Sequence, residues 1–167
     1  LIVFDDADIA LVADKATMGG FLNSGQDCTA ATRILIHESI YQQTADALVK
    51  ATEQFKVGNP FDADTMVGSM VSDAQQKAVA GFVERAEKAG AKVLIGGKPL
   101  TRAGYYYPPT IIANVAQDSE IVQEEVFGPV LTLQSFSSDE EALRMANDVK
   151  YGLASSVFTK DLKRANL

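Results

Sequence analysis

The stretch VLTLQSFSSDEEALRMANDVKYGLASSVFT, residues 130–159, decides the fold class of this chain. The apolar run Val130–Phe136 is typical of a buried strand, and Ala154–Thr159 of a second one. Between them, Asp139–Val149 places apolar side chains at helical spacing. Strands that are joined by a helix of about ten residues pair in parallel in layered folds. The stretch therefore predicts an α/β fold with a mainly parallel sheet.

The same alternation of strands and helices extends from this stretch to the start of the chain. Further strands are expected at Leu1–Phe4, Arg33–His37, Lys92–Ile95 and within Tyr105–Ala113. Further helices are expected from Ala7 to Phe21, at Tyr41–Phe55, from Ser72 to Ala89 and at Ser119–Val126. Because no repeat and no internal boundary interrupts the pattern, we expect one α/β domain segment, a mainly parallel sheet flanked by helices.

Several residues predict local structure at the ends of these elements. Asp5 or Asp6 is the expected N-cap of the first helix, and Ser72 with Gln75 forms a plausible capping box for the third. His37 is expected at the surface or as a cap, and Tyr105–Tyr107 are expected to pack at a sheet edge.

The charge balance excludes several classes of partner. The 167 residues carry a formal net charge of −7, and no run of lysines and arginines occurs. Such a chain is a poor ligand for nucleic acid or for an acidic membrane surface. No apolar stretch is long enough to span a bilayer, and no signal peptide is visible. We expect no nucleic-acid partner and no membrane association.

Cys28 is the single cysteine, and it follows the loop residues 23–27, Asn-Ser-Gly-Gln-Asp. One cysteine forms no intrachain disulfide, which fits a reducing cytoplasm, and with the single His37 it is too little for an ordinary zinc site. No metal is therefore expected. Cys28 is either a small buried apolar residue or a nucleophile, and in the second case backbone N–H groups of the turn would assist it.

Two motifs in this order favour the nucleophile. Residues 21–33, FLNSGQDCTAATR, resemble the active-site cysteine segment of aldehyde dehydrogenases, and residues 124–130, EEVFGPV, resemble the Glu-[Ile/Val]-Phe-Gly-Pro motif of that family. The resemblance covers essentially the whole chain in family order, since three further stretches agree with it: Val57–Asp62, Gly104–Thr110 and Tyr151–Ala154.

The resemblance implies a role for each motif. Cys28 would attack the aldehyde carbonyl, giving a thiohemiacetal and then a thioester, and its backbone N–H would contribute to the oxyanion hole. Glu125 and Phe127 would hold the nicotinamide riboside of NAD or NADP, with NAD favoured. Without the resemblance, Glu125 is a solvated acid at a helix end and Phe127 a core residue before a turn. The resemblance also implies a homodimer or homotetramer for the full-length enzyme.

Asp27 departs from many members of the family, which have an uncharged residue before the nucleophile. A carboxylate beside a thiol disfavours the thiolate through like-charge repulsion, and a cationic group on the substrate would offset this effect. We therefore hypothesise that Asp27 lines the substrate pocket and favours an amino-aldehyde such as 4-aminobutanal, as in the aminobutyraldehyde dehydrogenase branch. In the alternative interpretation Asp27 faces the loop backbone and has no role with substrate.

Residues 1–167 are expected to be a catalytic-domain segment, without the cofactor-binding domain and the oligomerisation arm. The Glu-Leu-Gly-Gly-Lys segment that carries the general base in this family does not occur in the chain. The isolated segment is therefore expected to be inactive. Two other functions stay open at this point: a cysteine acyl transferase or thioesterase, and a non-catalytic domain kept for assembly.

Overall fold

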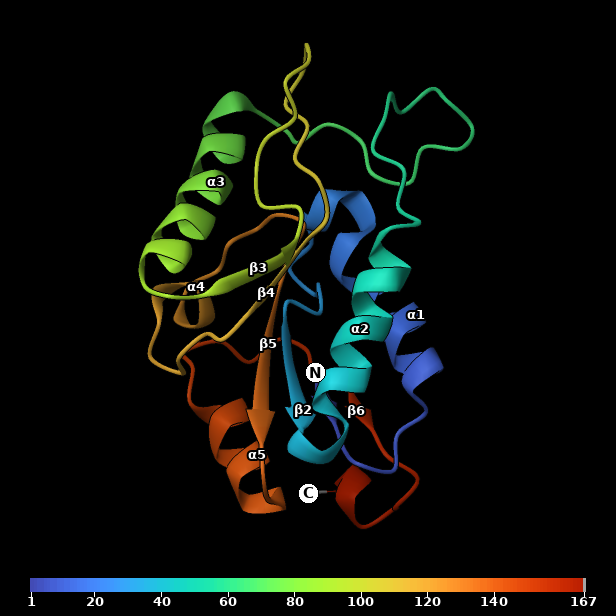
Figure 1. The fold of residues 1–167 in the computed structure, drawn as a ribbon, viewed down its shortest axis with the longest axis vertical. Coiled ribbons are helices and arrows are strands. Elements are labelled where there is room, and N and C mark those ends of the chain that lie inside the picture. The colour runs from blue at the N-terminus through green and yellow to red at the C-terminus, as the bar shows by residue number, and fades with distance from the viewer. Residues whose placement is uncertain (167) are drawn as a thin grey trace.

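The computed structural model describes residues 1–166, which form a six-stranded sheet between two layers of helices (Figure 1). The strands lie in the order β3-β4-β5-β2-β1-β6. Every neighbouring pair is parallel except β3 and β4, which confirms the expected mainly parallel α/β sheet. The strands are β1 (Ile2–Val3), β2 (Arg33–His37), β3 (Lys92–Ile95), β4 (Thr110–Ala113), β5 (Val130–Phe136) and β6 (Val157–Phe158).

Helices cover both faces of the sheet, two on one side and three on the other (Figure 1). The first pair is α1 (Ile9–Phe21) and α2 (Tyr41–Thr52), and the other three are α3 (Asp73–Lys88), α4 (Glu120–Gln123) and α5 (Asp139–Asn147). Short 3₁₀ turns lie at Leu22–Gly25, Glu38–Ile40 and Arg164–Asn166. No helix within residues 1–166 is long and apolar enough to cross a membrane.

The central strand β2 shows how the sequence forms this layered core. Ile34 and Ile36 are fully buried against α1 and α2, whereas Leu35, which points to the opposite face, packs with α5. Side chains alternate in this way because successive residues of a strand face opposite sides of the sheet. Full burial of one such side chain contributes roughly 1.5–3 kcal/mol. An apolar run without polar interruption is therefore what a strand covered on both faces requires.

The expected N-cap of α1 is wrong. Asp8 caps the helix, and its Oδ1 accepts hydrogen bonds from two N–H groups of the first turn. Asp5 and Asp6 are engaged elsewhere: Asp5 pairs with Arg164, and Asp6 accepts from the N–H of Lys160. These partners come from the far end of the sequence, so local pattern alone did not distinguish the three aspartates.

The cap of α3 is confirmed in part. Ser72 accepts a hydrogen bond from the N–H of Gln75 at 3.1 Å, but the Gln75 side chain does not return to Ser72. Its amide instead donates to the carbonyl oxygens of Val126 and Phe127. Gly90, with φ of +97°, follows the helix end as expected. The capping pattern thus located the helix start correctly and missed a tertiary contact.

Other local expectations differ in extent from the structure. The helix expected at Ser119–Val126 is only the single turn of α4, because the chain is already extended at Glu124. His37 is a cap, as expected, and accepts from the N–H of Ser39. Tyr106 and Tyr107 are buried beside the β3 edge, and the Tyr107 hydroxyl donates to the Gly97 carbonyl. Burial raises the pKa of Tyr107 above its usual range.

Candidate active site

The cysteine loop leaves α1 through a run of left-handed backbone. Asn23, Ser24 and Gly25 have φ values of 52°, 58° and 66°. Such a conformation costs roughly 1–2 kcal/mol for a residue with a side chain, so the surroundings must hold it. The Asn23 amide donates to the Gln26 carbonyl, and the Ser24 hydroxyl donates to the Gly68 carbonyl at 3.0 Å. The Gln26 side chain accepts from an N–H of residue 71, which anchors the loop a second time.

A tight turn then presents Cys28. The Asp27 carbonyl accepts from the N–H of Ala30, and Asp27 Oδ1 accepts from both the N–H and the hydroxyl of Thr29, each at 2.7 Å. These two bonds from Thr29 lower the pKa of Asp27. Cys28 is exposed, and within residues 1–166 its N–H has no acceptor. Within these residues Cys28 is therefore not part of the buried core.

Glu125 and Phe127 lie in the segment that leads into β5. Glu125 is exposed and lies beyond the end of α4, and its carboxylate has no partner within residues 1–166. Phe127 is partly buried, has a φ of 53° and belongs to none of the three core clusters, whereas its neighbour Val126 packs with α3 and α4. The interpretation of Phe127 as a core residue is therefore not supported. The Gln75 amide holds the turn by donating to the Val126 and Phe127 carbonyls.

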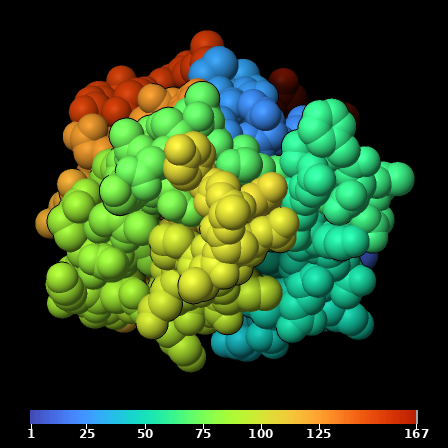
Figure 2. Space-filling view, turned by 90° about the horizontal axis from the view of Figure 1, so that it is seen from above, coloured from blue at the N-terminus to red at the C-terminus, as the bar shows by residue number. Residues whose placement is uncertain are grey.

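The sheet brings the two motifs together. β2 and β5 are parallel neighbours, so the segments that enter them lie at the same end of the sheet. The contact is close at Gly25, where an added Cβ would lie 2.2 Å from the Gly128 carbonyl oxygen. Figure 2, which looks onto this end, shows the blue segment that includes the cysteine loop beside the orange and red segments that include residues 125–155. Cys28, Asp27, Glu125 and Phe127 therefore belong to one region.

A third motif meets this region through side chains that precede β6. Lys150 donates to both carboxylate oxygens of Glu124 at 2.7 Å, and the Tyr151 hydroxyl lies 3.3 Å from Glu124 Oε2 and 3.3 Å from the Glu125 nitrogen. The hydrogen bond from Lys150 is the main reason that the pKa of Glu124 is lowered. The resemblance had grouped these motifs by sequence order, and the structure adds that they touch.

Comparison with known proteins decides the family. The sequence profile of the aldehyde dehydrogenase family matches residues 1–167. The chain belongs to this family. It is 43% identical over 166 residues to the chloroplastic betaine aldehyde dehydrogenase of Beta vulgaris, a match that covers 98% of this chain and 33% of that protein. It is 42% identical to the peroxisomal aminoaldehyde dehydrogenase 1 of Pisum sativum, again over 98% of this chain and 33% of that protein.

Solved aldehyde dehydrogenases share the fold. The betaine aldehyde dehydrogenase of Staphylococcus aureus in complex with NAD⁺ superimposes with a TM-score of 0.95 at 41% identity, covering 99% of this chain and 34% of that one. The chain thus spans about a third of the length of these relatives.

Sequence reasoning does not identify two residues that hold the candidate site, Gln75 and Tyr151. The sequence indicates Gln75 only as part of a capping box, and Tyr151 only as part of a stretch that resembles the family. Arg33, the arginine five residues after the cysteine, donates to the Met145 carbonyl at 3.0 Å and so ties the start of β2 to α5. Polar residues just outside the periodic apolar positions are the only sequence signal for such contacts, and that signal does not identify their partners.

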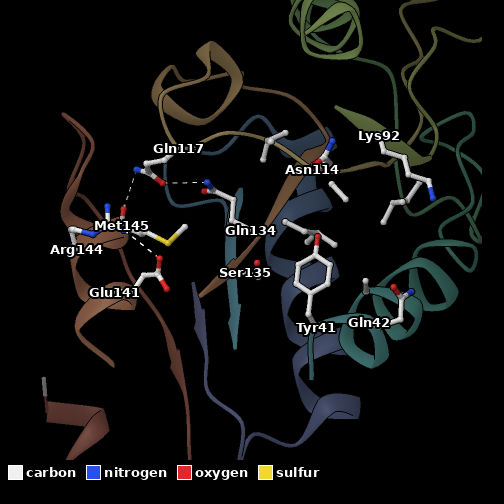
Figure 3. A pocket seen from close by; sticks show the side chains of 15 residues that line it. Tyr41, Gln42, Lys92, Asn114, Gln117, Gln134, Ser135, Glu141, Arg144 and Met145 are labelled. Atoms are coloured by element: carbon white, nitrogen blue, oxygen red, sulfur yellow. Dashed lines mark hydrogen bonds and ion pairs between the residues drawn. The ribbon is translucent and has the colours of Figure 1, made fainter. Parts of the chain in front are cut away.

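One groove lies apart from these residues. It has a volume of about 550 Å³ and is lined by the β5 residues Leu133–Ser135 together with residues from α2, β3 and α5 (Figure 3). The Gln134 and Gln117 side chains point toward each other across one wall, while Tyr41 points in from α2 (Figure 3). None of Cys28, Asp27, Glu125 or Phe127 lines it.

Proposed function

We propose that the protein containing this chain oxidises an aldehyde to a carboxylic acid with NAD as the acceptor, and that Cys28 is its nucleophile. The observation that carries the proposal is an exposed Cys28 in a loop whose Gly25 packs against Gly128, in the segment with Glu125 and Phe127. A cysteine acyl transferase or thioesterase would use the same thiol but would leave Glu125 and Phe127 without a role.

The Cys28 sulfur would form a bond to the aldehyde carbon, and the carbonyl oxygen would become an oxyanion. The unpaired Cys28 N–H is a donor suited to that oxygen, because a main-chain group held by a turn needs no reorganisation as charge develops. Loss of hydride from the carbon leaves a thioester on Cys28. Water then adds to the thioester, the carbon–sulfur bond breaks and the acid is released.

The residues present fit a nicotinamide cofactor. The Glu125 carboxylate is an exposed acceptor without a partner in residues 1–166, which suits the hydroxyl donors of a ribose. The partly exposed Phe127 ring offers an apolar surface to the nicotinamide ring. NAD, when bound, supplies the acceptor for the hydride. NAD is favoured over NADP because a matched structure is a complex with NAD⁺.

Asp27 is proposed to favour a cationic aldehyde. Asp27 Oδ1 accepts hydrogen bonds from the N–H and the hydroxyl of Thr29. For this one carboxylate oxygen, the interpretation in which Asp27 faces the loop is correct. Oδ2 has no partner within residues 1–166, and the residue is exposed. Matched relatives are named for betaine aldehyde and for aminoaldehydes, which carry a cationic nitrogen, and another for succinate semialdehyde, which does not. 4-Aminobutanal remains our proposed substrate.

Residues 1–167 are proposed to be a catalytic-domain segment, with the cofactor-binding domain and the oligomerisation arm elsewhere in a homodimer or homotetramer. A cytoplasmic location stays a prediction, since matched relatives include proteins named as chloroplastic and peroxisomal. The isolated chain is expected to be inactive, because it contains no Glu-Leu-Gly-Gly-Lys segment to supply a base.

The test is NAD reduction by the full-length protein and by the isolated 167 residues, with 4-aminobutanal and with an uncharged aldehyde of similar length. We expect the full-length protein to reduce NAD, with the amino-aldehyde preferred. We expect no reduction of NAD by the isolated chain. Equal use of both aldehydes would refute the substrate proposal alone. No reduction with either aldehyde would refute the dehydrogenase proposal, and a Cys28→Ser variant with wild-type rates would refute the assigned nucleophile.

A further inference from the structure

In the part of the chain that the structure describes, no hydrogen bond or ion pair orients the Glu125 carboxylate, and the residue is exposed. Within these residues, the position of Glu125 depends on the contacts of its main chain. The N–H of Glu125 donates to a side chain, the Tyr151 hydroxyl, at 3.3 Å.

The Tyr151 hydroxyl bridges two consecutive residues. It accepts from the Glu125 N–H and donates to Glu124 Oε2, also at 3.3 Å. A hydroxyl satisfies both bonds at once because it is both a donor and an acceptor. Phenylalanine in place of Tyr151 would keep the ring and lose both bonds.

The segment that carries Tyr151 is itself anchored. Lys150 donates to both oxygens of Glu124, and its ammonium lies 5.3 Å from the centre of the Tyr151 ring. Three residues before Tyr151, the Asp148 carbonyl accepts from the side-chain amides of Gln117 and Gln123, each at 2.9 Å. The contacts at Asp148 restrain the segment independently of the tyrosine hydroxyl.

We propose that Tyr151 is a positioning residue, which fixes the main chain of Glu125 so that its carboxylate faces the nicotinamide ribose. The inference rests on the proposed function, in which Glu125 binds that ribose. The Tyr151 hydroxyl bonds to Glu124 and Glu125, so Tyr151 acts through Glu125 and is not a catalytic residue. Its hydroxyl contributes by limiting the directions that an otherwise unrestrained carboxylate can take.

The test is binding of NAD and of AMP to the full-length protein, measured by isothermal titration calorimetry. AMP contains the adenosine half of NAD and lacks the nicotinamide riboside. For Tyr151→Phe we expect the Kd for NAD to rise about three- to tenfold, which corresponds to the loss of one or two ordinary hydrogen bonds. The Kd for AMP should not change. In kinetics, the KM for NAD should rise while kcat at saturating NAD changes less.

Tyr105→Phe is the matched control, because Tyr105 is 43% exposed and Tyr151 47%. We expect Tyr105→Phe to bind both nucleotides as the wild type does. An unchanged Kd for NAD in Tyr151→Phe would overturn the inference, as would an equal loss of NAD and AMP binding, which indicates a general disturbance.

Two further measurements separate this inference from the proposed function. If the wild type binds no NAD, the proposed function fails. If Glu125→Gln binds NAD as tightly as the wild type, the assigned role of Glu125 is wrong and the role of Tyr151 falls with it. If Glu125→Gln weakens NAD binding but Tyr151→Phe does not, only the inference about Tyr151 fails.

Discussion

At the scale of single residues, Gly25 joins the cysteine loop to the segment before β5. Its φ of 66° and its approach to Gly128 both exclude a side chain. We predict that Gly25→Ala lowers the free energy of unfolding by more than about 2 kcal/mol, since backbone strain and a clash add. Urea denaturation of the full-length protein would measure it. Gly152→Ala is the control, because within residues 1–166 no atom beyond its chain neighbours lies within 4 Å of the added Cβ. It should change the free energy of unfolding by less than about 0.5 kcal/mol. If both variants lose the same stability, the prediction for Gly25 is wrong.

Asp27 combines a structural and an electrostatic role, and two variants separate them. Asparagine keeps an oxygen that accepts from Thr29, so Asp27→Asn should preserve the turn and remove the charge. We predict that its preference for 4-aminobutanal over an uncharged aldehyde, measured as a ratio of kcat/KM values, falls roughly five- to tenfold. Asp27→Ala should in addition slow the reaction with both aldehydes. A ratio that does not change in Asp27→Asn would rule out a charge effect on the substrate.

At the scale of elements, helix α3 illustrates how a cap and a site contact differ. Ser72→Ala should lower the free energy of unfolding by about 1 kcal/mol, the usual effect of a lost N-cap, and leave NAD affinity unchanged. Gln75→Glu replaces a donor with a carboxylate opposite two carbonyl oxygens. We predict a loss of about 1–3 kcal/mol in stability together with weaker NAD binding, because the Phe127 turn loosens. Denaturation and calorimetry of both variants test this, and similar NAD affinities in the two would contradict it.

The boundaries of the elements were predictable to different degrees. The expected strands Arg33–His37 and Val130–Phe136 have the same bounds in the structure. A strand that is covered on both faces of a sheet needs a long apolar run, and such runs are easily recognised in a sequence. The cap of α1 and the length of α4 were not predictable in the same way. Any of the three aspartates Asp5, Asp6 and Asp8 is a suitable N-cap by residue type. Asp5 and Asp6 instead bind residues that follow β6, through an ion pair and a hydrogen bond.

At the scale of the whole molecule, Asp6 links the first and last segments. Burial opposes its ionisation, but hydrogen bonds from the Lys160 N–H and the Thr159 hydroxyl outweigh this effect, so the pKa of Asp6 is lowered below 3.8. A carboxyl with a lowered folded-state pKa stabilises the fold above its unfolded pKa, and this contribution is lost as the pH falls through the folded value. We therefore predict that stability declines below about pH 4 and that Asp6→Asn flattens this decline. Denaturation of the wild type and of Asp6→Asn between about pH 2 and 6 would measure this dependence. If stability falls equally with pH in both proteins, the prediction is wrong.

The sequence by itself determined the α/β class, most strands and helices, and the resemblance from which Cys28, Glu125 and Phe127 were chosen. Periodicity determines the class and the elements because it depends on neighbours a few residues apart, whereas the three site residues come from the resemblance alone. The strand order follows from the tertiary structure: β2 and β5 are parallel neighbours, which brings Gly25 of the cysteine loop against the Gly128 backbone. The tertiary structure also decided that Gln75 holds the Phe127 turn and that Tyr151 holds Glu125. These contacts join residues far apart in the chain, and a single polar side chain carries no local pattern that identifies its partner.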